Sequence, residues 1–457
     1  MGSRWSWARR LVVVGLASAC VVGAASPAFG AGSIRADQWH LDAMHAPEMW
    51  KTSTGEGITV AVIDGGFKLD HPDLVGQFLP GRDFSGSPGG VGSFVDGHGT
   101  EMASLIAGTG RSGGGTGAYG LAPGAKILPL KMNDGSDRSL GASISSDFLD
   151  EVGQAVNYAV EQGAKVINVS EESAAVTATP ENVAKLNRIL AAARAKGVLV
   201  VASVGNSAKD GNLLMYPAAL PNVVGIGALD RNGTVTDESQ TGPHVTLTAP
   251  GAEVIDACTS STGYCKRHGT SAAAALVSAS AALVWAVHKD WTANQVLRVL
   301  IDTAGKPNDG SNRRDDIGYG VVRPRIALTS PGDPGPADRS PLASDVVLPS
   351  SVLSPAAGLP SSASSASGPA ASPTAGAVGA PPVQPKAGAS SGSVGVLPVV
   401  GGLVAGLVLV VGVVFAVLRR RRPAVVEPPV HVPMLPLPPW ATPESSQVYR
   451  PPARPEE

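Results

Sequence analysis

Three residues that could serve as a nucleophile, a base and an orienting carboxylate stand at the ends of predicted elements. Asp64 follows the apolar, β-branched run 58–63, which predicts a buried parallel strand. His98 lies in a glycine-flanked loop that runs into a helix, and Ser271 opens a long apolar helix predicted over residues 270–287. Acyl transfer needs these three groups, and Asp, His, Ser is one of the chain orders in which they occur.

Ser271 taken alone has two interpretations. A hydroxyl at a helix N-terminus commonly caps the helix by accepting a backbone N–H. The same helix end is positively polarised, so it would also stabilise the negative charge that develops during nucleophilic attack on a carbonyl. The cap is the commoner role of a lone serine, and the nucleophile is favoured here because Asp64 and His98 stand upstream.

Two further groups could imitate a catalytic base. His268 precedes Ser271 by three residues on a predicted strand, from which its ring would have difficulty turning back onto the hydroxyl. His71 and Asp73 flank a proline, which indicates a turn just beyond the strand that ends at Asp64. We therefore interpret both groups as structural.

Strand-like and helix-like segments alternate along the middle of the chain. Helices are predicted near residues 147–162, 181–196 and 292–302, and strands over 165–169, 198–202 and 223–228. This alternation predicts an α/β fold in which helices cover both faces of a central, mostly parallel sheet. The domain is expected to end near residue 328.

The N-terminus has the pattern of a secretory signal peptide, which we expect to span residues 1–31. Arg9 and Arg10 precede an apolar run over residues 11–25, and small residues suited to a cleavage site follow. A retained membrane anchor is the alternative, but the run is short for a membrane-spanning helix.

Composition and cysteine usage fit an exported protein. Lys and Arg number 35 against 37 Asp and Glu, so no basic excess indicates a nucleic-acid partner. One of the three cysteines lies in the signal peptide, which leaves Cys258 and Cys265 as an even pair. Because exported chains meet oxidising conditions, we expect these two to form a disulfide just ahead of Ser271.

Three segments of different character follow the predicted domain. Residues 329–393 are rich in Pro, Ala and Ser and predict a disordered linker. Residues 394–418 are almost wholly apolar and long enough to cross a bilayer, although a buried globular helix would share that composition. The tail 419–457 begins with four arginines, which place it in the cytoplasm. We expect a single-pass protein of the cell membrane whose folded domain is extracytoplasmic.

Three motifs resemble the active-site signatures of the subtilisin-like serine proteases. They are Val-Ala-Val-Ile-Asp-Gly-Gly at 60–66, His-Gly-Thr-Glu-Met-Ala at 98–103 and Gly-Thr-Ser-Ala-Ala at 269–273. The resemblance implies a peptidase domain over residues 57–328, folded as a three-layer sandwich around a mostly parallel sheet. Residues 32–56 would then form an N-terminal extension.

The resemblance also implies a role for each site residue. Asp64 would be the orienting carboxylate, His98 the general base and then acid, and Ser271 the nucleophile of a serine endopeptidase. Asn206 matches the side-chain donor of the oxyanion hole. Its simpler interpretation is a loop asparagine that tolerates left-handed backbone geometry.

The chain departs from the family pattern at several positions. Gly65 stands where Ser or Thr is usual, Ala275 where Pro is usual, and Ala279 where Gly is usual. None of these changes removes a catalytic group, but together they are compatible with a slow or highly selective enzyme.

The segment that usually forms the substrate cleft also differs. The family pattern reads Ser-Leu-Gly, whereas this chain has Ser170, Glu171 and Glu172. We hypothesise that the two carboxylates disfavour acidic substrates or favour a basic residue near the cleavage site. The alternative is that both are solvated or paired within the protein.

The order of segments resembles the mycosins, the membrane-anchored subtilisin-like proteases associated with type VII secretion in actinobacteria. That resemblance implies selective cleavage of exported proteins, association with a membrane secretion complex, and an extension that wraps the domain. A largely structural subunit of such a complex and a surface protease unrelated to secretion are the alternatives. We expect no cofactor, and no metal because carboxylates with calcium-loop spacing are missing from the sequence.

Overall fold

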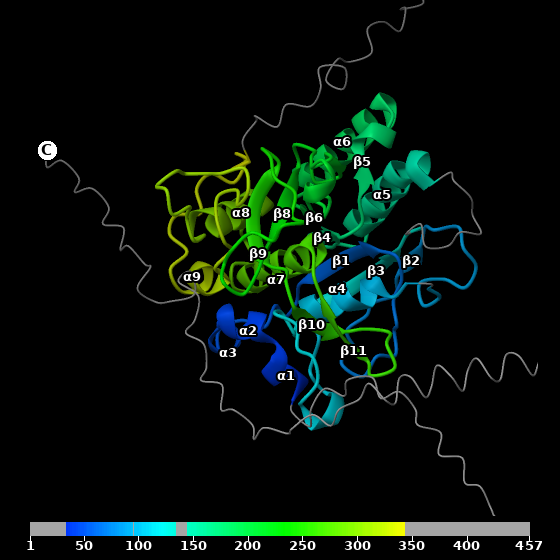
Figure 1. The fold of residues 1–457 in the computed structure, drawn as a ribbon, viewed down its shortest axis with the longest axis vertical. Helices are drawn as coiled ribbons and strands as arrows, with labels where there is room; N and C mark the ends of the chain where they lie inside the picture. The colour runs from blue at the N-terminus through cyan, green and yellow to red at the C-terminus, as the bar shows by residue number, and fades with distance from the viewer. Residues whose placement is uncertain (1–32, 95, 134–143, 343–457) are drawn as a thin grey trace, which may run out of the picture. The chain divides into compact units, whose positions relative to one another are not determined.

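A parallel sheet forms the centre of the computed structural model, which describes residues 33–94, 96–133 and 144–342. Within these residues its strand order is β2-β3-β1-β4-β6-β8-β9, and every neighbouring pair is parallel (Figure 1). The strands are β1 (Thr59–Asp64), β2 (Arg82–Asp83), β3 (Lys126–Lys131), β4 (Val166–Val169), β6 (Leu199–Ser203), β8 (Val223–Leu229) and β9 (Val245–Pro250). The predicted mostly parallel α/β sheet is confirmed.

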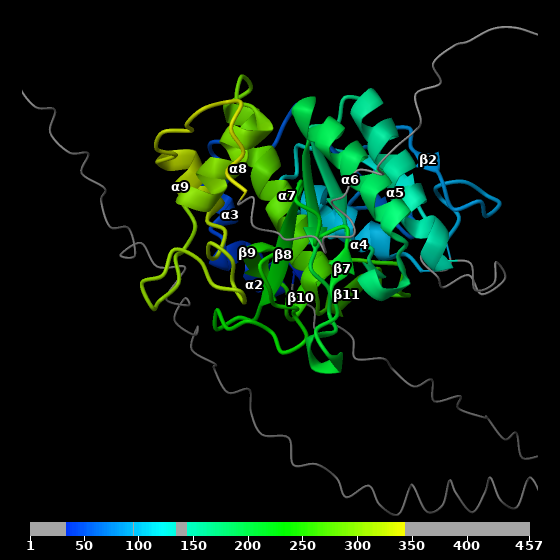
Figure 2. The ribbon, with the colours of Figure 1, turned by 90° about the horizontal axis from the view of Figure 1, so that it is seen from above.

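Helices cover both faces of this sheet. The longer helices are α4 (His98–Ala107), α5 (Ile144–Glu161), α6 (Pro180–Ala195), α7 (Thr270–Val287), α8 (Ala293–Asp302) and α9 (Pro324–Thr329). α4 and α7 pack on one face, with α8 and α9 beside them, while α5 and α6 pack on the other (Figure 2). Strand β1 shows the division, since Val60 and Val62 face α4 and α7 whereas Ala61 and Ile63 face α5 and α6.

Helix α7 runs through the larger of the two cores. Its sequence is apolar on all sides, and 15 of its 18 residues are buried. Among the residues that the structure describes, α7 alone is long and apolar enough to cross a membrane, but 83% of it is buried inside the protein. Its apolar surface therefore belongs to the core.

Two short antiparallel pairs lie outside the main sheet. They are β5 (Ser173–Ala174) with β7 (Met215–Tyr216), and β10 (Val254–Ala257) with β11 (Tyr264–Arg267). The β10–β11 hairpin matters for the site, because β11 leads directly into α7.

The N-terminal extension packs into the domain through three short helices, α1 (Ile34–Asp37), α2 (Trp39–Ala43) and α3 (Ala46–Met49). The Gln38 amide, which is fully buried, donates to the carbonyls of Tyr119 and Ile255 and accepts from the Tyr119 N–H. Leu41 belongs to the same core cluster as α4 and α7. The extension thus contributes core side chains to the fold.

Residues 329–342 were expected to belong to the disordered linker, and that prediction is wrong for this stretch. The Arg298 guanidinium on α8 donates to the carbonyls of Pro334 and Pro336, at 2.7 and 3.1 Å. The side-chain amide of Asn294 donates to the Ala337 carbonyl at 2.9 Å. Prolines cannot donate backbone hydrogen bonds, but their carbonyls accept from polar side chains of a neighbouring helix.

The helices and strands named from the sequence all occur, with ends that differ by at most a few residues. The sequence did not predict the strands β3 and β9. The predicted signal peptide, the rest of the linker, the apolar segment 394–418 and the tail lie outside the described residues.

The packing of the extension predicts a large cost for truncating Leu41. This side chain is 0% exposed, so Leu41→Ala should lower the free energy of unfolding by about 2–5 kcal/mol. Urea unfolding would measure this. The matched control is Leu69→Ala, because Leu69 is 42% exposed and should change stability by only about 0.5 kcal/mol. Equal stability of the two variants would contradict a core role for the extension.

Candidate active site

Asp64 is the last residue of β1 and is fully buried. Its Oδ1 accepts hydrogen bonds from the Gly65 N–H at 2.8 Å and from Nδ1 of His98 at 2.9 Å. Its Oδ2 is buried without a hydrogen-bond partner in the described structure. Because a buried carboxylate is costly unless it is paired, Asp64 depends on the histidine.

His98 is the first residue of α4, so the helix fixes the position of its ring. Its side chain is 26% exposed, whereas that of Asp64 is not exposed at all. The hydrogen bond to Asp64 requires a proton on Nδ1, which leaves Nε2 as the nitrogen that can accept a proton from a nucleophile.

The charge environment favours the protonated ring. Burial alone would lower the pKa of His98, but the charge and hydrogen bond of Asp64, together with the carboxylates of Glu171 and Glu101, raise it well above its usual value. Oε1 of Glu171 lies 3.6 Å from Nδ1 of the ring. The site is therefore electrostatically prepared to hold the imidazolium that forms when His98 takes a proton.

Ser271 is the second residue of α7, and Gly269 occupies the cap position. The alternative interpretation, in which Ser271 caps the helix, is therefore excluded. Gly269 has a φ of +132°, a backbone conformation that favours glycine, and this turn presents the serine at the helix end. The Ser271 hydroxyl donates to the carbonyl of Ser170 at 3.4 Å.

His98 and Ser271 line one open cavity of about 140 Å³. The other lining residues are Asp96, Glu101, Met102, Arg267, His268 and Ala272. In the described structure the Ser271 hydroxyl is hydrogen-bonded to the Ser170 carbonyl and not to His98. Looser hydrogen bonds are common in catalytic sites without substrate, so the geometry is compatible with a base and a nucleophile.

Asn206 follows β6, and the oxygen of its side-chain amide is held by hydrogen bonding. Its Oδ1 accepts from the backbone N–H of Thr270 at 2.8 Å, one residue before Ser271. Since a backbone N–H can only donate, Oδ1 must face Thr270 and the side-chain NH₂ must point elsewhere. Asn206 is exposed, and its NH₂ group is the end of the amide that does not face Thr270.

Ser170, Glu171 and Glu172 contact three different parts of the site. Ser170 is buried and also donates from Oγ to the Ser271 carbonyl at 3.4 Å. Glu171 lies beside His98, and Glu172 accepts from the Ser203 hydroxyl at 3.1 Å. Each glutamate therefore has a partner within the protein, and their role in substrate choice stays a prediction.

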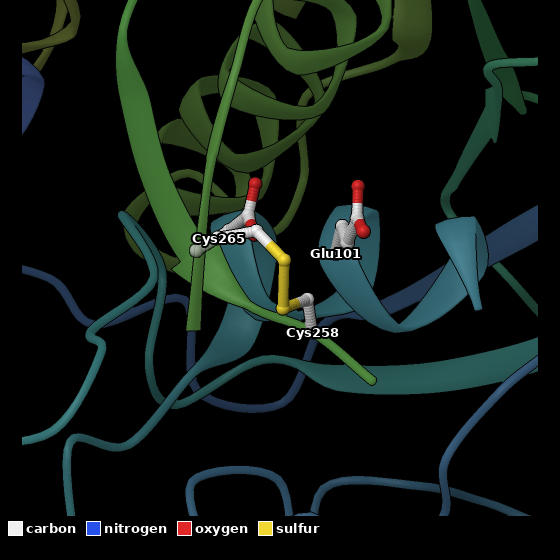
Figure 3. Close-up of side chains that lie close together, drawn as sticks. Glu101, Cys258 and Cys265 are labelled. Atoms are coloured by element: carbon white, nitrogen blue, oxygen red, sulfur yellow. A yellow bond between two sulfur atoms is a disulfide. The ribbon is translucent and has the colours of Figure 1, made fainter. Parts of the chain in front are cut away.

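The disulfide braces the hairpin that leads to the nucleophile. Cys258 and Cys265 are joined with their Cα atoms 5.8 Å apart, and β11 ends two residues later at Arg267. The Arg267 guanidinium pairs with the buried carboxylate of Glu101 on α4, and Figure 3 shows the Glu101 side chain beside the disulfide. This ion pair connects the segment before Ser271 to the helix that begins at His98.

Glu101 and Arg267 were not assigned a role from the sequence. Glu101 lies three residues after His98, and residues at that spacing share a helix face, so its proximity to the histidine could have been predicted. Its partner Arg267 is 166 residues away, and no local pattern indicates that pairing.

A second carboxyl group lies close to the Arg267–Glu101 ion pair. Asp256 on β10 is fully buried, and neither of its carboxyl oxygens has a hydrogen-bond partner. Burial and the nearby Glu101 raise the pKa of Asp256 well above its usual value, against the opposing charges of Arg267 and His98. Burial thus favours the neutral form of this carboxyl more than it would for an exposed aspartate.

The side chains that could bind a metal ion already have other bonding partners. Oxygens of Glu101 and Asp256 lie near the two cysteine sulfurs, but disulfide sulfurs provide no thiolate for a metal. Ligand atoms of Asp64, His98 and Glu171 also lie within 4.8 Å of one another. There, Nδ1 of the histidine is already used to donate to Asp64.

The two groups that could imitate a catalytic base differ in position. His71 is buried and its Nε2 contacts the Gly263 carbonyl, while Asp73 accepts from the N–H groups of Ser112 and Ala118, so both hold loops together. His268 is exposed at the cavity. Among the residues that the structure describes, no carboxylate pairs with its ring in the way that would orient a catalytic base.

The chain matches known proteins over the described domain. The model of the subtilase family of peptidases matches residues 55–320. The major intracellular serine protease of Bacillus subtilis (strain 168) is 33% identical over 252 residues, which cover 53% of this chain and 73% of that protein. Mycosin-1 of Mycolicibacterium smegmatis is 29% identical over 331 residues, which cover 64% of this chain and 72% of that protein.

Solved structures show the same similarity. The crystal structure of MycP1 from the ESX-1 type VII secretion system matches with a TM-score of 0.57 and 28% identity, over 67% of this chain and 89% of that chain. A chain of the periplasmic assembly from the ESX-5 inner membrane complex matches with a TM-score of 0.56 and 27% identity, over 68% and 89%.

The position of Glu171 predicts a shift in pH dependence. Its carboxylate raises the pKa of His98, and a base must be neutral to act, so activity should rise with pH as His98 loses its proton. Glu171→Gln should lower that pKa and move the acidic limb of the rate profile to lower pH. The rate of Ser271 modification by a fluorophosphonate, followed against pH, measures this.

The matched control is Glu181→Gln, which removes one exposed carboxylate from α6 on the opposite face of the sheet. It should leave the acidic limb where it is in the wild type. An unchanged or upward-shifted limb in Glu171→Gln would show that Glu171 does not act on the base.

Proposed function

The chain belongs to the subtilase family, and we propose that it is a membrane-anchored, extracytoplasmic serine endopeptidase that cleaves exported proteins through an acyl-enzyme. The observation that carries the proposal is the buried hydrogen bond from Nδ1 of His98 to Asp64, beside a cavity that His98 shares with Ser271. A base, its orienting carboxylate and a hydroxyl at a helix N-terminus are the groups that acyl transfer requires.

In the proposed first step, Ser271 attacks the carbonyl carbon of the scissile peptide bond and Nε2 of His98 takes the hydroxyl proton. Asp64 holds the ring in the tautomer that accepts at Nε2 and stabilises the imidazolium that results. His98 then gives the proton to the leaving amine. A water molecule, activated by the same histidine, hydrolyses the acyl-enzyme and frees Ser271.

The negative charge on the former carbonyl oxygen needs fixed donors. The side-chain NH₂ of Asn206 is turned away from Thr270 and is our candidate for one of them. The Ser271 N–H lies in the first turn of α7, where a backbone N–H has no partner within the helix, and is our candidate for a second donor. Losing such a side-chain donor costs about 10²–10³ in turnover in subtilisin, the family member from which that value comes.

We further propose a role in type VII secretion. The similarity to mycosin-1 and to structures from the ESX-1 and ESX-5 systems supports it. The apolar segment 394–418 would anchor the chain, with the arginines after it on the cytoplasmic side. The enzyme would then act on exported proteins next to the secretion complex.

A mainly structural role in such a complex is the second candidate. The similarity to a chain of the periplasmic assembly favours it, because a protease-like domain there could serve as a building block. The two roles are separable, since an assembly function needs the fold and not the nucleophile.

A fluorophosphonate probe tests the enzyme directly. The full-length wild type should be labelled, and Ser271→Ala should not be labelled because the nucleophile is gone. Asn206→Ala should react more slowly by about 10²-fold while remaining folded. In-gel fluorescence and intact mass measure these outcomes.

His268, which could imitate the catalytic base, offers the matched control. His98→Ala should abolish labelling, whereas His268→Ala, which alters the same cavity, should keep it. A folded wild type that is never labelled would contradict the proposed activity. Rescue of a secretion defect by Ser271→Ala would then support the structural role.

A further inference from the structure

Asp64, His98 and Glu171 bring three atoms that can bind a metal ion to one point of the site. Nδ1 of His98 lies 2.9 Å from Oδ1 of Asp64 and 3.6 Å from Oε1 of Glu171. One ligand atom of each residue lies within 4.8 Å of those of the other two. An aspartate and a histidine in contact occur in every Asp-His-Ser triad, but zinc sites use at least three protein ligands. Glu171 adds the third ligand, at a position where the family pattern has leucine.

The spacing of these atoms suits Zn²⁺. Zinc lies about 2.0–2.1 Å from an imidazole nitrogen and about 2.0–2.2 Å from a carboxylate oxygen, in tetrahedral geometry, so two of its ligands are about 3.4 Å apart. The distances of 2.9 and 3.6 Å lie on either side of this value. Side-chain shifts of about 0.5 Å or less would therefore bring both oxygens to bonding distance, and water would complete the tetrahedron.

The charges at this point also favour a cation. Asp64 is 0% exposed, and among the residues that the structure describes its Oδ2 has no hydrogen-bond partner. Glu171 places a second carboxylate beside the same ring. The side chains of His98 and Glu171 are 26% and 21% exposed, so both are accessible from the solvent. A dication would compensate two carboxylates that are held close together in a largely buried place.

We propose that Asp64, His98 and Glu171 bind Zn²⁺ as an inhibitor of the enzyme, and this inference rests on the proposed peptidase function. The ion takes the place of the proton on Nδ1, because ligands lose their protons when they bind a metal. The single proton of the neutral ring is then on Nε2. Nε2 has no lone pair left to accept the Ser271 proton, so acyl transfer stops. The ion thus blocks the reaction and is not a cofactor of it.

A second place for zinc is the cavity, which is lined by His98 and by the exposed ring of His268. An ion there would depend on His268, whereas an ion at Nδ1 depends on Glu171. The Nδ1 position is favoured because two carboxylate oxygens already lie within 3.6 Å of that nitrogen.

The first experiment follows the labelling of the full-length protein by an alkyl fluorophosphonate in the presence of zinc chloride. Thiol reductants are left out, so that the Cys258–Cys265 disulfide stays closed and offers no thiolate. Saturating Zn²⁺ should slow the labelling of Ser271 by at least about 10²-fold, because the general base is lost. EDTA should restore the rate. Ca²⁺ and Mg²⁺ at the same concentration should have no such effect, because they prefer oxygen ligands.

Variants locate the ion, and each is compared with its own rate without metal. Glu171→Leu should raise the Zn²⁺ concentration for half-inhibition by at least about tenfold, since even an outer-shell partner of a metal is worth about 10–100-fold in affinity. Glu171→Gln should act in the same direction if the leucine variant does not fold. Glu181→Gln, on α6, and His268→Ala should keep the zinc sensitivity of the wild type.

Calorimetry tests the site without relying on activity. Ser271→Ala keeps all three ligands, so it should show a Zn²⁺-binding step that a further Glu171→Leu change removes. Absence of this step, or equal zinc sensitivity of wild type and Glu171→Leu, would overturn the proposal. Loss of sensitivity in His268→Ala would move the ion to the cavity and overturn it as well. If zinc binds and depends on Glu171 but the wild type is never labelled at Ser271, the metal site stands and the proposed peptidase function fails.

Discussion

The buried negative charge of Asp64 is the constraint on which the site depends. The carboxylate stands at the end of a central strand with no exposure to solvent, and its two partners are a backbone N–H and the ring of His98. A charge in such a place requires compensation, so the protein gains stability from the contact that also orients the base. Fold and catalysis are coupled at this hydrogen bond.

The remaining elements bring the other groups to the same edge of the sheet. β4 and β6 neighbour β1 in order, and the residues that follow them supply Ser170, Glu171 and Asn206. The β10–β11 hairpin, closed by its disulfide, delivers the chain into α7, and the Arg267–Glu101 pair connects it to α4. His98 and Ser271, the proposed base and nucleophile, thus sit on two helices that this ion pair connects.

Local sequence patterns were sufficient to predict the groups that stand at ends of elements. Asp64, His98 and Ser271 each follow or open a segment whose periodicity is visible in the chain. Contacts between distant segments were not predictable in this way. Glu172 and Ser203 are 31 residues apart, and the packing of residues 329–342 depends on Arg298, which composition alone does not reveal. The low apolar content of residues 329–342 indicated disorder. Composition does not reveal that backbone carbonyls of this stretch accept hydrogen bonds from side chains of a neighbouring helix.

The most direct measurement of the central claim is the turnover of Asp64→Asn. An asparagine preserves the shape of the side chain but would present an amide to Nδ1 and favour the wrong tautomer of His98. We predict that turnover of a peptide substrate falls by about 10⁴, the size of this effect in a serine protease with a different fold, while the domain stays folded. Turnover within about tenfold of wild type would contradict the claim that the Asp64–His98 hydrogen bond organises this site.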